Sequence, residues 1–151
     1  MKQEDILLKE IDLIQSCINR MASNSFIVKG WLITLIAVAL ALLPETINTR
    51  LVCIVGLLII ICFWYLDAFF LKTERLYRWK YDWVIENRIK GDDNFYFDLN
   101  PYNKDMWLKN NDGTKKKQPS ILSIMFTKTL VPLYVLLVMA VIFVLVYSCF
   151  E

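Results

Sequence analysis

Three long apolar runs alternate with charged stretches along the chain. They cover residues 26–43, 51–71 and 129–148. The only charged residue in the first run is Lys29 and the only one in the second is Asp67, whereas the third run has no charged residue. A helix needs about 20 predominantly apolar residues to cross a hydrocarbon layer of ~30 Å. The pattern therefore predicts three transmembrane helices. Burial of these runs in the core of a soluble protein is the weaker alternative, because too little polar sequence is left to cover three such helices.

Residues 1–25 show the pattern of an amphipathic helix and not that of a membrane span. An apolar stripe at alternating spacings of four and three runs through this stretch, formed by Leu7, Ile11, Ile14, Ile18 and Met21. Such spacing predicts an amphipathic helix with a coiled-coil-like seam. The seam can pack on helices of its own chain, on other copies around a symmetry axis, or on the membrane surface. The run Ser23-Asn24-Ser25 offers N-cap side chains and predicts a bend or a new helix start before the first span.

The second span does not end at the membrane boundary. Neither Gly nor Pro occurs from Leu71 to Lys90, so the helix is expected to continue to about residue 90, where Gly91 provides a C-cap. Leu76, Trp79 and Trp83 form an apolar stripe on this extension. An aromatic helix in water must be covered, so these residues are expected to contact either their own chain or neighbouring subunits.

Residues 91–118 carry turn signals and no long periodic pattern. Asn100-Pro101 and Asp112-Gly113 predict turns, and the aromatic residues between and before them indicate that the segment packs on the helices. A helix is expected to begin at Pro119-Ser120 and to lead into the third span. The predicted fold class is thus an all-α integral membrane protein: three transmembrane helices, an N-terminal amphipathic helix, and a long extension of the second span.

Lys29 and Asp67 are the two charges inside the spans. The short turn at Pro44–Arg50 makes the first two spans an antiparallel hairpin, and both residues lie at similar distances from its centre. A lone charge in lipid is costly and usually pairs. We therefore expect Lys29 and Asp67 to lie close together, within one protomer or across a subunit boundary. The alternative is that Lys29 snorkels and Asp67 reaches interfacial water.

Basic residues are distributed unevenly along the chain. Of 17 Lys and Arg residues, 12 lie in residues 72–128 and four in residues 2–29, while the turn after the first span holds one. The positive-inside rule then predicts a multi-pass membrane protein with its N-terminus and residues 72–128 in the cytoplasm. The Lys115-Lys116-Lys117 run fits headgroup contact with membrane lipid, and direct nucleic-acid binding has little support.

The composition argues against several kinds of chemistry. The chain has no histidine, four glycines and four cysteines without paired spacing. It therefore lacks a histidine base, a histidine metal ligand and a glycine-rich phosphate loop. No catalytic residues, no metal site and no cofactor are expected, and the protein is not expected to be an enzyme.

Three stretches resemble a family of small bacterial membrane proteins. They begin at Arg20-Met-Ala-Ser-Asn-Ser-Phe-Ile, at Phe63-Trp-Tyr-Leu-Asp-Ala-Phe-Phe and at Thr127-Lys-Thr-Leu, and so touch all three spans. The family resembled includes the accessory proteins encoded beside type VI-B CRISPR RNA-targeting nucleases. The resemblance implies a homo-oligomeric ring that forms a pore and depolarises the inner membrane in antiphage defence, with a functional link to an RNA-guided nuclease. It also implies a HEPN-like Arg/His motif, of which Arg20, Asn87 and Arg88 would be a remnant because no histidine follows them.

Three hypotheses follow from these patterns. The first is a homo-oligomeric, membrane-permeabilising effector in which the residue 7–21 seam and the aromatic extension make subunit contacts. The second is a membrane anchor or sensor that recruits a cytoplasmic partner to the extension. The third, a membrane-tethered HEPN-like ribonuclease, has the least support because the acid–base group is missing.

Overall fold

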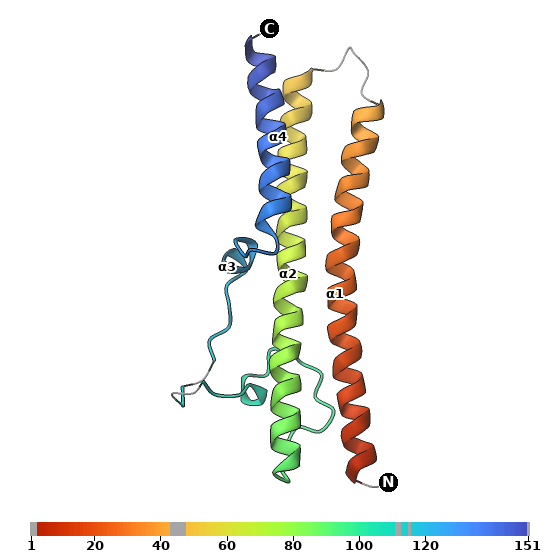
Figure 1. Ribbon diagram of the computed structural model, residues 1–151, viewed down its shortest axis with the longest axis vertical. Coiled ribbons are helices and arrows are strands. Elements are labelled where there is room, and N and C mark those ends of the chain that lie inside the picture. The colour runs from red at the N-terminus through yellow and green to blue at the C-terminus, as the bar shows by residue number, and fades with distance from the viewer. Residues whose placement is uncertain (1–2, 43–47, 111–112, 115, 151) are drawn as a thin grey trace. The chain divides into compact units, whose positions relative to one another are not determined.

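The computed structural model describes residues 3–42, 48–110, 113–114 and 116–150. Its regular elements are all helices: α1 (Gln3–Leu42), α2 (Thr49–Ile89), the short 3₁₀ helix η1 (Lys104–Met106), α3 (Ile121–Met125) and α4 (Val131–Phe150) (Figure 1). Three of them, α1, α2 and α4, are long and apolar enough to cross a membrane. The prediction of an all-helical chain with three helices long and apolar enough to cross a membrane is confirmed. The predicted turn after the first span falls largely on residues 43–47, outside the described residues.

The bend or restart expected at Ser23–Ser25 is wrong, because α1 is one helix through this point. The physical reason is visible at Ser25. Its hydroxyl donates to the carboxylate of Asp67 and does not cap a helix start. With neither Pro nor Gly before Gly30, nothing in this stretch opposes helix continuation.

The end of α2 agrees with the glycine signal. Gly91 has a φ of +80°, a left-handed conformation that favours glycine. Its N–H donates to the Arg88 carbonyl at 3.1 Å, and the Asp92 N–H donates to the Asn87 carbonyl at 3.0 Å. These two bonds form a Schellman motif, which satisfies carbonyls that the helix end would otherwise leave unpaired.

The approach to the third span differs from the expected continuous helix. Ser120 caps α3 by accepting a hydrogen bond from the Ser123 N–H, but α3 ends at Met125. A turn follows in which the Thr127 hydroxyl donates to the Ile124 carbonyl at 2.7 Å. The last span then begins at Val131, with Pro132 in its first turn, where the missing N–H removes no helical bond.

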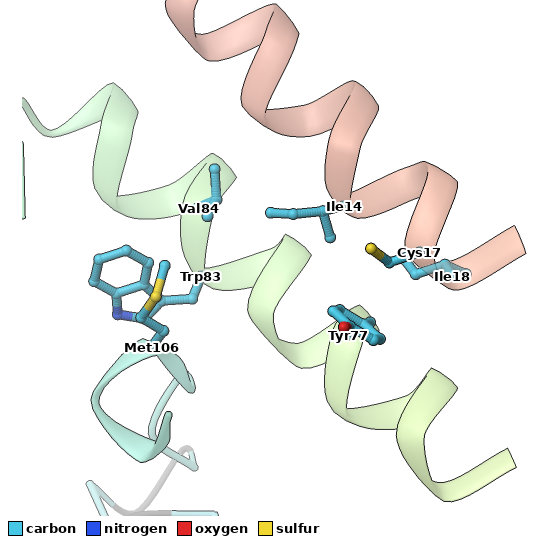
Figure 2. Close-up of a cluster of buried hydrophobic side chains, with 7 residues drawn as sticks. All are labelled: Ile14, Cys17, Ile18, Tyr77, Trp83, Val84 and Met106. Atoms are coloured by element: carbon cyan, nitrogen blue, oxygen red, sulfur yellow. The ribbon is translucent and has the colours of Figure 1, made fainter. Parts of the chain in front are cut away.

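The chain forms two compact units. Unit 1 contains residues 1–23 and 70–119, and unit 2 contains residues 24–69 and 120–151. In unit 1, Ile14, Cys17 and Ile18 of α1 face Tyr77 and Val84 of α2, and Trp83 reaches Met106 of η1 (Figure 2). This cluster is the core of unit 1, and it joins the first turns of α1, the last turns of α2 and the following segment.

Unit 2 holds the apolar parts of α1 and α2 together with α3 and α4. The ring of Trp64 in α2 stacks on that of Tyr134 in α4, with centroids 5.5 Å apart and planes 2° apart. At the other end of α4, the Arg50 guanidinium donates to the Ser148 carbonyl at 3.4 Å. The two helices therefore run antiparallel, as successive membrane crossings must.

Candidate functional site

Asp67 is a carboxylate buried inside unit 2. Its side chain is 0% exposed, and it meets groups from the two other spans. The Lys29 ammonium of α1 lies 2.7 Å from Oδ2 and 2.9 Å from Oδ1. The Ser25 hydroxyl donates to Oδ1, and the Tyr134 hydroxyl of α4 donates to Oδ2 at 3.0 Å. We call Ser25, Lys29, Asp67 and Tyr134 the Asp67 cluster.

The helices place these groups by simple register. Ser25 and Lys29 are one helical turn apart, so both face Asp67, and the Lys29 ammonium also donates to the Ser25 hydroxyl at 2.8 Å. Tyr134 is held by its stacking on Trp64, whose indole N–H donates to the Met125 carbonyl at 3.0 Å. The phenol therefore has a fixed direction toward the carboxylate.

The cluster is electrically balanced and fully hydrogen-bonded. A buried ion costs several kcal/mol unless a counter-charge and hydrogen bonds compensate it. Here one carboxylate receives bonds from Lys29, Ser25 and Tyr134, and so links three helices at one point. The structure thus brings Lys29 and Asp67 together within one chain. Lys29 is 25% exposed, so its ammonium lies at the edge of the buried cluster.

A second buried ion pair lies in unit 1, between Glu10 and Arg88. The Glu10 carboxylate accepts from Arg88 Nε at 2.9 Å and Nη2 at 3.0 Å, a bidentate arrangement. The two side chains are 1% and 4% exposed. The remaining Arg88 nitrogen, Nη1, donates to the carbonyls of Asp92 and Asn94, and Glu10 also accepts from the Phe97 N–H at 3.1 Å. The pair therefore holds the loop that follows α2.

Lys80 provides a third polar anchor in unit 1. Its ammonium is buried and lies 3.1 Å from the Asp98 carboxylate, and it also donates to the carbonyls of Asp98 and Asn100. Burial by itself would raise the pKa of Asp98, but hydrogen bonds from the Asn103 amide, the Asn100 N–H and Lys80 hold that pKa below its usual range. The segment after α2 is thus fastened to α2 by charges as well as by aromatic packing.

The seam predicted as a subunit contact has a partner in its own chain. Ile14 and Ile18 are buried in the unit 1 core, and Leu7, Ile11 and Met21 pack against it. Packing of the seam on its own chain, one of the alternatives open from the sequence, is therefore observed, with Leu7, Ile11 and Met21 partly buried. Its assignment to oligomer contacts stays a prediction.

The aromatic extension is likewise covered by its own chain. Leu76 is 0% exposed and Trp83 is buried. Trp79 meets Trp107 edge-on at 5.4 Å, and the Lys116 ammonium lies 5.1 Å from the Trp79 ring centroid. The segment after α2 supplies these contacts, so the three residues do not form an open surface for subunits.

The residues of the candidate nuclease remnant each make structural contacts. Arg88 is occupied by Glu10, and the Asn87 amide donates to the Trp83 carbonyl at 2.9 Å within α2. Arg20 contacts the Cys17 sulfur at 3.8 Å on α1. Among the described residues, no group of three or more metal-ligating side chains comes together.

Glu10 and Tyr134 belong to these buried polar contacts and are not predicted from the sequence. Glu10 sits three residues after Leu7 and four before Ile14, so it lies on the buried side of α1, and a charge there signals a required partner. Tyr134 had no comparable signal, because one tyrosine near the start of an apolar run is common at membrane interfaces. Comparisons with protein families, with characterised proteins and with solved structures find no match for this chain.

Proposed function

We propose that this chain is a homo-oligomeric protein of the bacterial inner membrane that permeabilises that membrane, acting as an antiphage effector linked to an RNA-guided, RNA-targeting nuclease. The observation that carries the permeabilising role is the Lys29–Asp67 pair, 2.7 Å apart inside the three-span unit. A buried pair is weak support for stability, and apolar residues often hold helices equally well. Charges kept inside a membrane unit therefore point to a role in transport or gating.

The low burial of the spans supports assembly in the membrane. Only 11% of the apolar window in α1 and 6% of that in α4 is buried inside the chain. Lipid or further copies must cover the rest. Most exposed residues of these windows are apolar, with Thr34 of α1 an exception whose hydroxyl donates to the Gly30 carbonyl at 2.9 Å. The Asp67 cluster is therefore the charged group that the spans offer to a conducting state. We propose that this state requires the cluster to open.

The organisation of unit 1 supports the proposed topology. Residues 1–23 and 70–119 pack into one unit, and two segments that share a core must lie on the same side of a membrane. Residues 1–23 hold three Lys and Arg residues and residues 70–119 hold 11, against one in residues 44–50, which favours the cytoplasmic side for both segments. The antiphage role and the link to a nuclease come from the resemblance of the sequence alone.

A membrane anchor that recruits a cytoplasmic partner is the second candidate. It is favoured by the exposed aromatic side chains of Phe95, Tyr96 and Phe97 in unit 1. A membrane-tethered ribonuclease has the least support, because the chain lacks histidine and Arg88 is bound to Glu10.

The test is a membrane-potential measurement on the purified full chain in liposomes that carry a potassium gradient. Wild type, Asp67→Asn and the charge swap Lys29→Asp/Asp67→Lys are compared, with Lys90→Gln as a control because its pair with Glu86 is exposed. We expect Asp67→Asn to increase leakage at least tenfold, the swap to return it toward wild type, and the control to match wild type. If an intact oligomer of wild type and of Asp67→Asn holds the gradient, the permeabilising role is wrong.

A further inference from the structure

An apolar groove lies inside unit 2, between its three long helices. Its volume is about 460 Å³, and its walls come from residues 35–40 of α1, 49–60 of α2 and 137–144 of α4. Apart from the hydroxyl of Thr49 and the thiol of Cys53, the described lining residues are Leu, Ile, Val, Ala and Gly, and none of them is charged. We call this space the apolar groove.

The apolar groove exists because small residues line it on all three helices. Ala39, Gly56 and Ala140 each leave room that a larger side chain would fill. A Cβ added at Gly56 would meet no atom within 4 Å. Protein interiors are otherwise close-packed, and a space with apolar walls does not hold ordered water. The groove is therefore a place for an apolar molecule.

The length of the groove matches one leaflet of a membrane. From Thr49 to Ile60 the helix rises about 16 Å, roughly half of a hydrocarbon layer of ~30 Å. A volume of about 460 Å³ over that length gives a mean cross-section of about 29 Å². A helix with its side chains is about 10 Å across, and its cross-section is therefore about 80 Å². The groove is thus too narrow for a helix of a second copy but wide enough for a single hydrocarbon chain.

A cation lies at one end of the apolar groove. Arg50 follows Thr49, and Ser148 lies one helical turn beyond Val144. The exposed Arg50 guanidinium donates to the Ser148 carbonyl at 3.4 Å, across this end of the groove. A guanidinium has five N–H donors in a geometry that suits phosphate, so the bond to Ser148 leaves donors for an anion. Arg50 is the one charged residue that the structure describes between residues 30 and 66.

We propose that the apolar groove binds one acyl chain of a phospholipid and that Arg50 binds the phosphate of the same lipid. A groove that is apolar over the depth of one leaflet and ends at a guanidinium matches the two chemical parts of such a molecule. In the proposed topology, the lipid belongs to the leaflet opposite the cytoplasm. The inference requires the helices to lie in a membrane, but it rests neither on permeabilisation nor on a homo-oligomer.

The position of the lipid is tested first on the unaltered chain. The full chain in liposomes is given phosphatidylglycerol with a photoactivatable diazirine at the end of one acyl chain, and mass spectrometry locates the attachment. We expect attachment near Ile60 and Leu137, at the end of the groove distant from Arg50. Lipid that only surrounds the helices would label exposed residues outside the groove, such as Leu58 and Phe143, to the same extent. That result overturns the site.

Two substitutions then test the groove and its cation separately. Gly56→Phe fills the groove, and Gly30→Phe is the matched control, because a Cβ at either glycine meets no atom within 4 Å while Gly30 does not line the groove. Arg50→Gln removes the cation, and Lys90→Gln removes an exposed charge of unit 1 as its control. Native mass spectrometry of the full chain in detergent measures the apparent Kd for phosphatidylglycerol, and circular dichroism checks the helix content of each variant.

The two substitutions have different expected sizes. We expect Gly56→Phe to weaken binding by roughly tenfold or more and Arg50→Gln by about fivefold, the effect of one arginine near an anionic lipid surface, while both controls match wild type. A Gly56→Phe variant that binds like wild type overturns the site, and an unchanged Kd in Arg50→Gln overturns the phosphate contact. If Gly56→Phe keeps its lipid but lowers the mass of an oligomer, a second copy fills the groove and the proposal is wrong.

Discussion

Breaking the Glu10–Arg88 pair should release the loop after α2. Both side chains are almost fully buried, with 1% and 4% exposure, and Glu10 accepts three hydrogen bonds, two from Arg88 and one from the Phe97 N–H. Removal of one partner leaves an uncompensated buried charge, which typically costs about 3–5 kcal/mol. We therefore expect Glu10→Met and Arg88→Met each to lower the free energy of unfolding of unit 1 by about 3 kcal/mol or more.

The double variant Glu10→Met/Arg88→Met distinguishes a buried ion pair from general packing. Because it removes both charges, it should lose less stability than the two single variants together, by about 3 kcal/mol. Lys90→Met is the control, since its exposed pair with Glu86 should contribute no more than about 1 kcal/mol. Unfolding by urea in detergent is followed by tryptophan fluorescence, with hydrogen exchange of the amides of residues 92–97 as the local readout.

Two results would refute this reasoning. Single variants that change the unfolding free energy by less than about 1 kcal/mol would show that the pair does not support unit 1. Additive effects in the double variant would show that the two charges do not interact, whatever their separation of 2.9 Å implies.

Three further predictions concern single positions. Gly91→Ala should destabilise the end of α2 by about 1–2 kcal/mol, because the φ of +80° is unfavourable for alanine. An added Cβ meets no atom within 4 Å, so this backbone strain is the whole effect, and hydrogen exchange of the last turn of α2 measures it. The pKa of Asp98 is lower in the folded chain than in the unfolded chain. Its contribution to stability is therefore fully present above the unfolded pKa of about 3.9 and is lost as the pH falls through the folded pKa. Asp98→Asn should remove this part of the pH dependence of the melting temperature. Tyr134→Phe removes one hydrogen bond to Asp67 and should lower thermal stability in detergent by about 0.6–1.7 kcal/mol, whereas Tyr147→Phe, on an exposed face of α4, should be neutral.

The helices and their order could be predicted from the sequence because their signals are local. Long apolar runs define the three helices that are long and apolar enough to cross a membrane. The absence of Gly and Pro lets α2 continue to Ile89, and Gly91 ends it. Counting residues along a tight hairpin also placed Lys29 and Asp67 at one depth, and in the structure the two side chains meet. These conclusions needed only helix geometry and the cost of charge in lipid.

The remaining features depend on contacts between distant segments. The partner of Glu10 is Arg88, 78 residues away, and no spacing rule connects them. The left-handed conformations of Phe95 and Phe97 have no sequence signal, since glycine or asparagine is expected there. Serine favours helix caps, so the sequence predicts a helix start at Ser25, but in the structure the buried carboxylate of Asp67 accepts the hydrogen bond from its hydroxyl.

The potassium-gradient assay with liposomes tests membrane permeabilisation most directly. The Lys29–Asp67 pair, 2.7 Å apart, predicts that an intact oligomer dissipates the gradient and that Asp67→Asn accelerates the loss at least tenfold, while Lys29→Asp/Asp67→Lys returns it toward the wild-type rate. Oligomers of wild type and of Asp67→Asn that both hold the gradient would contradict a permeabilising role.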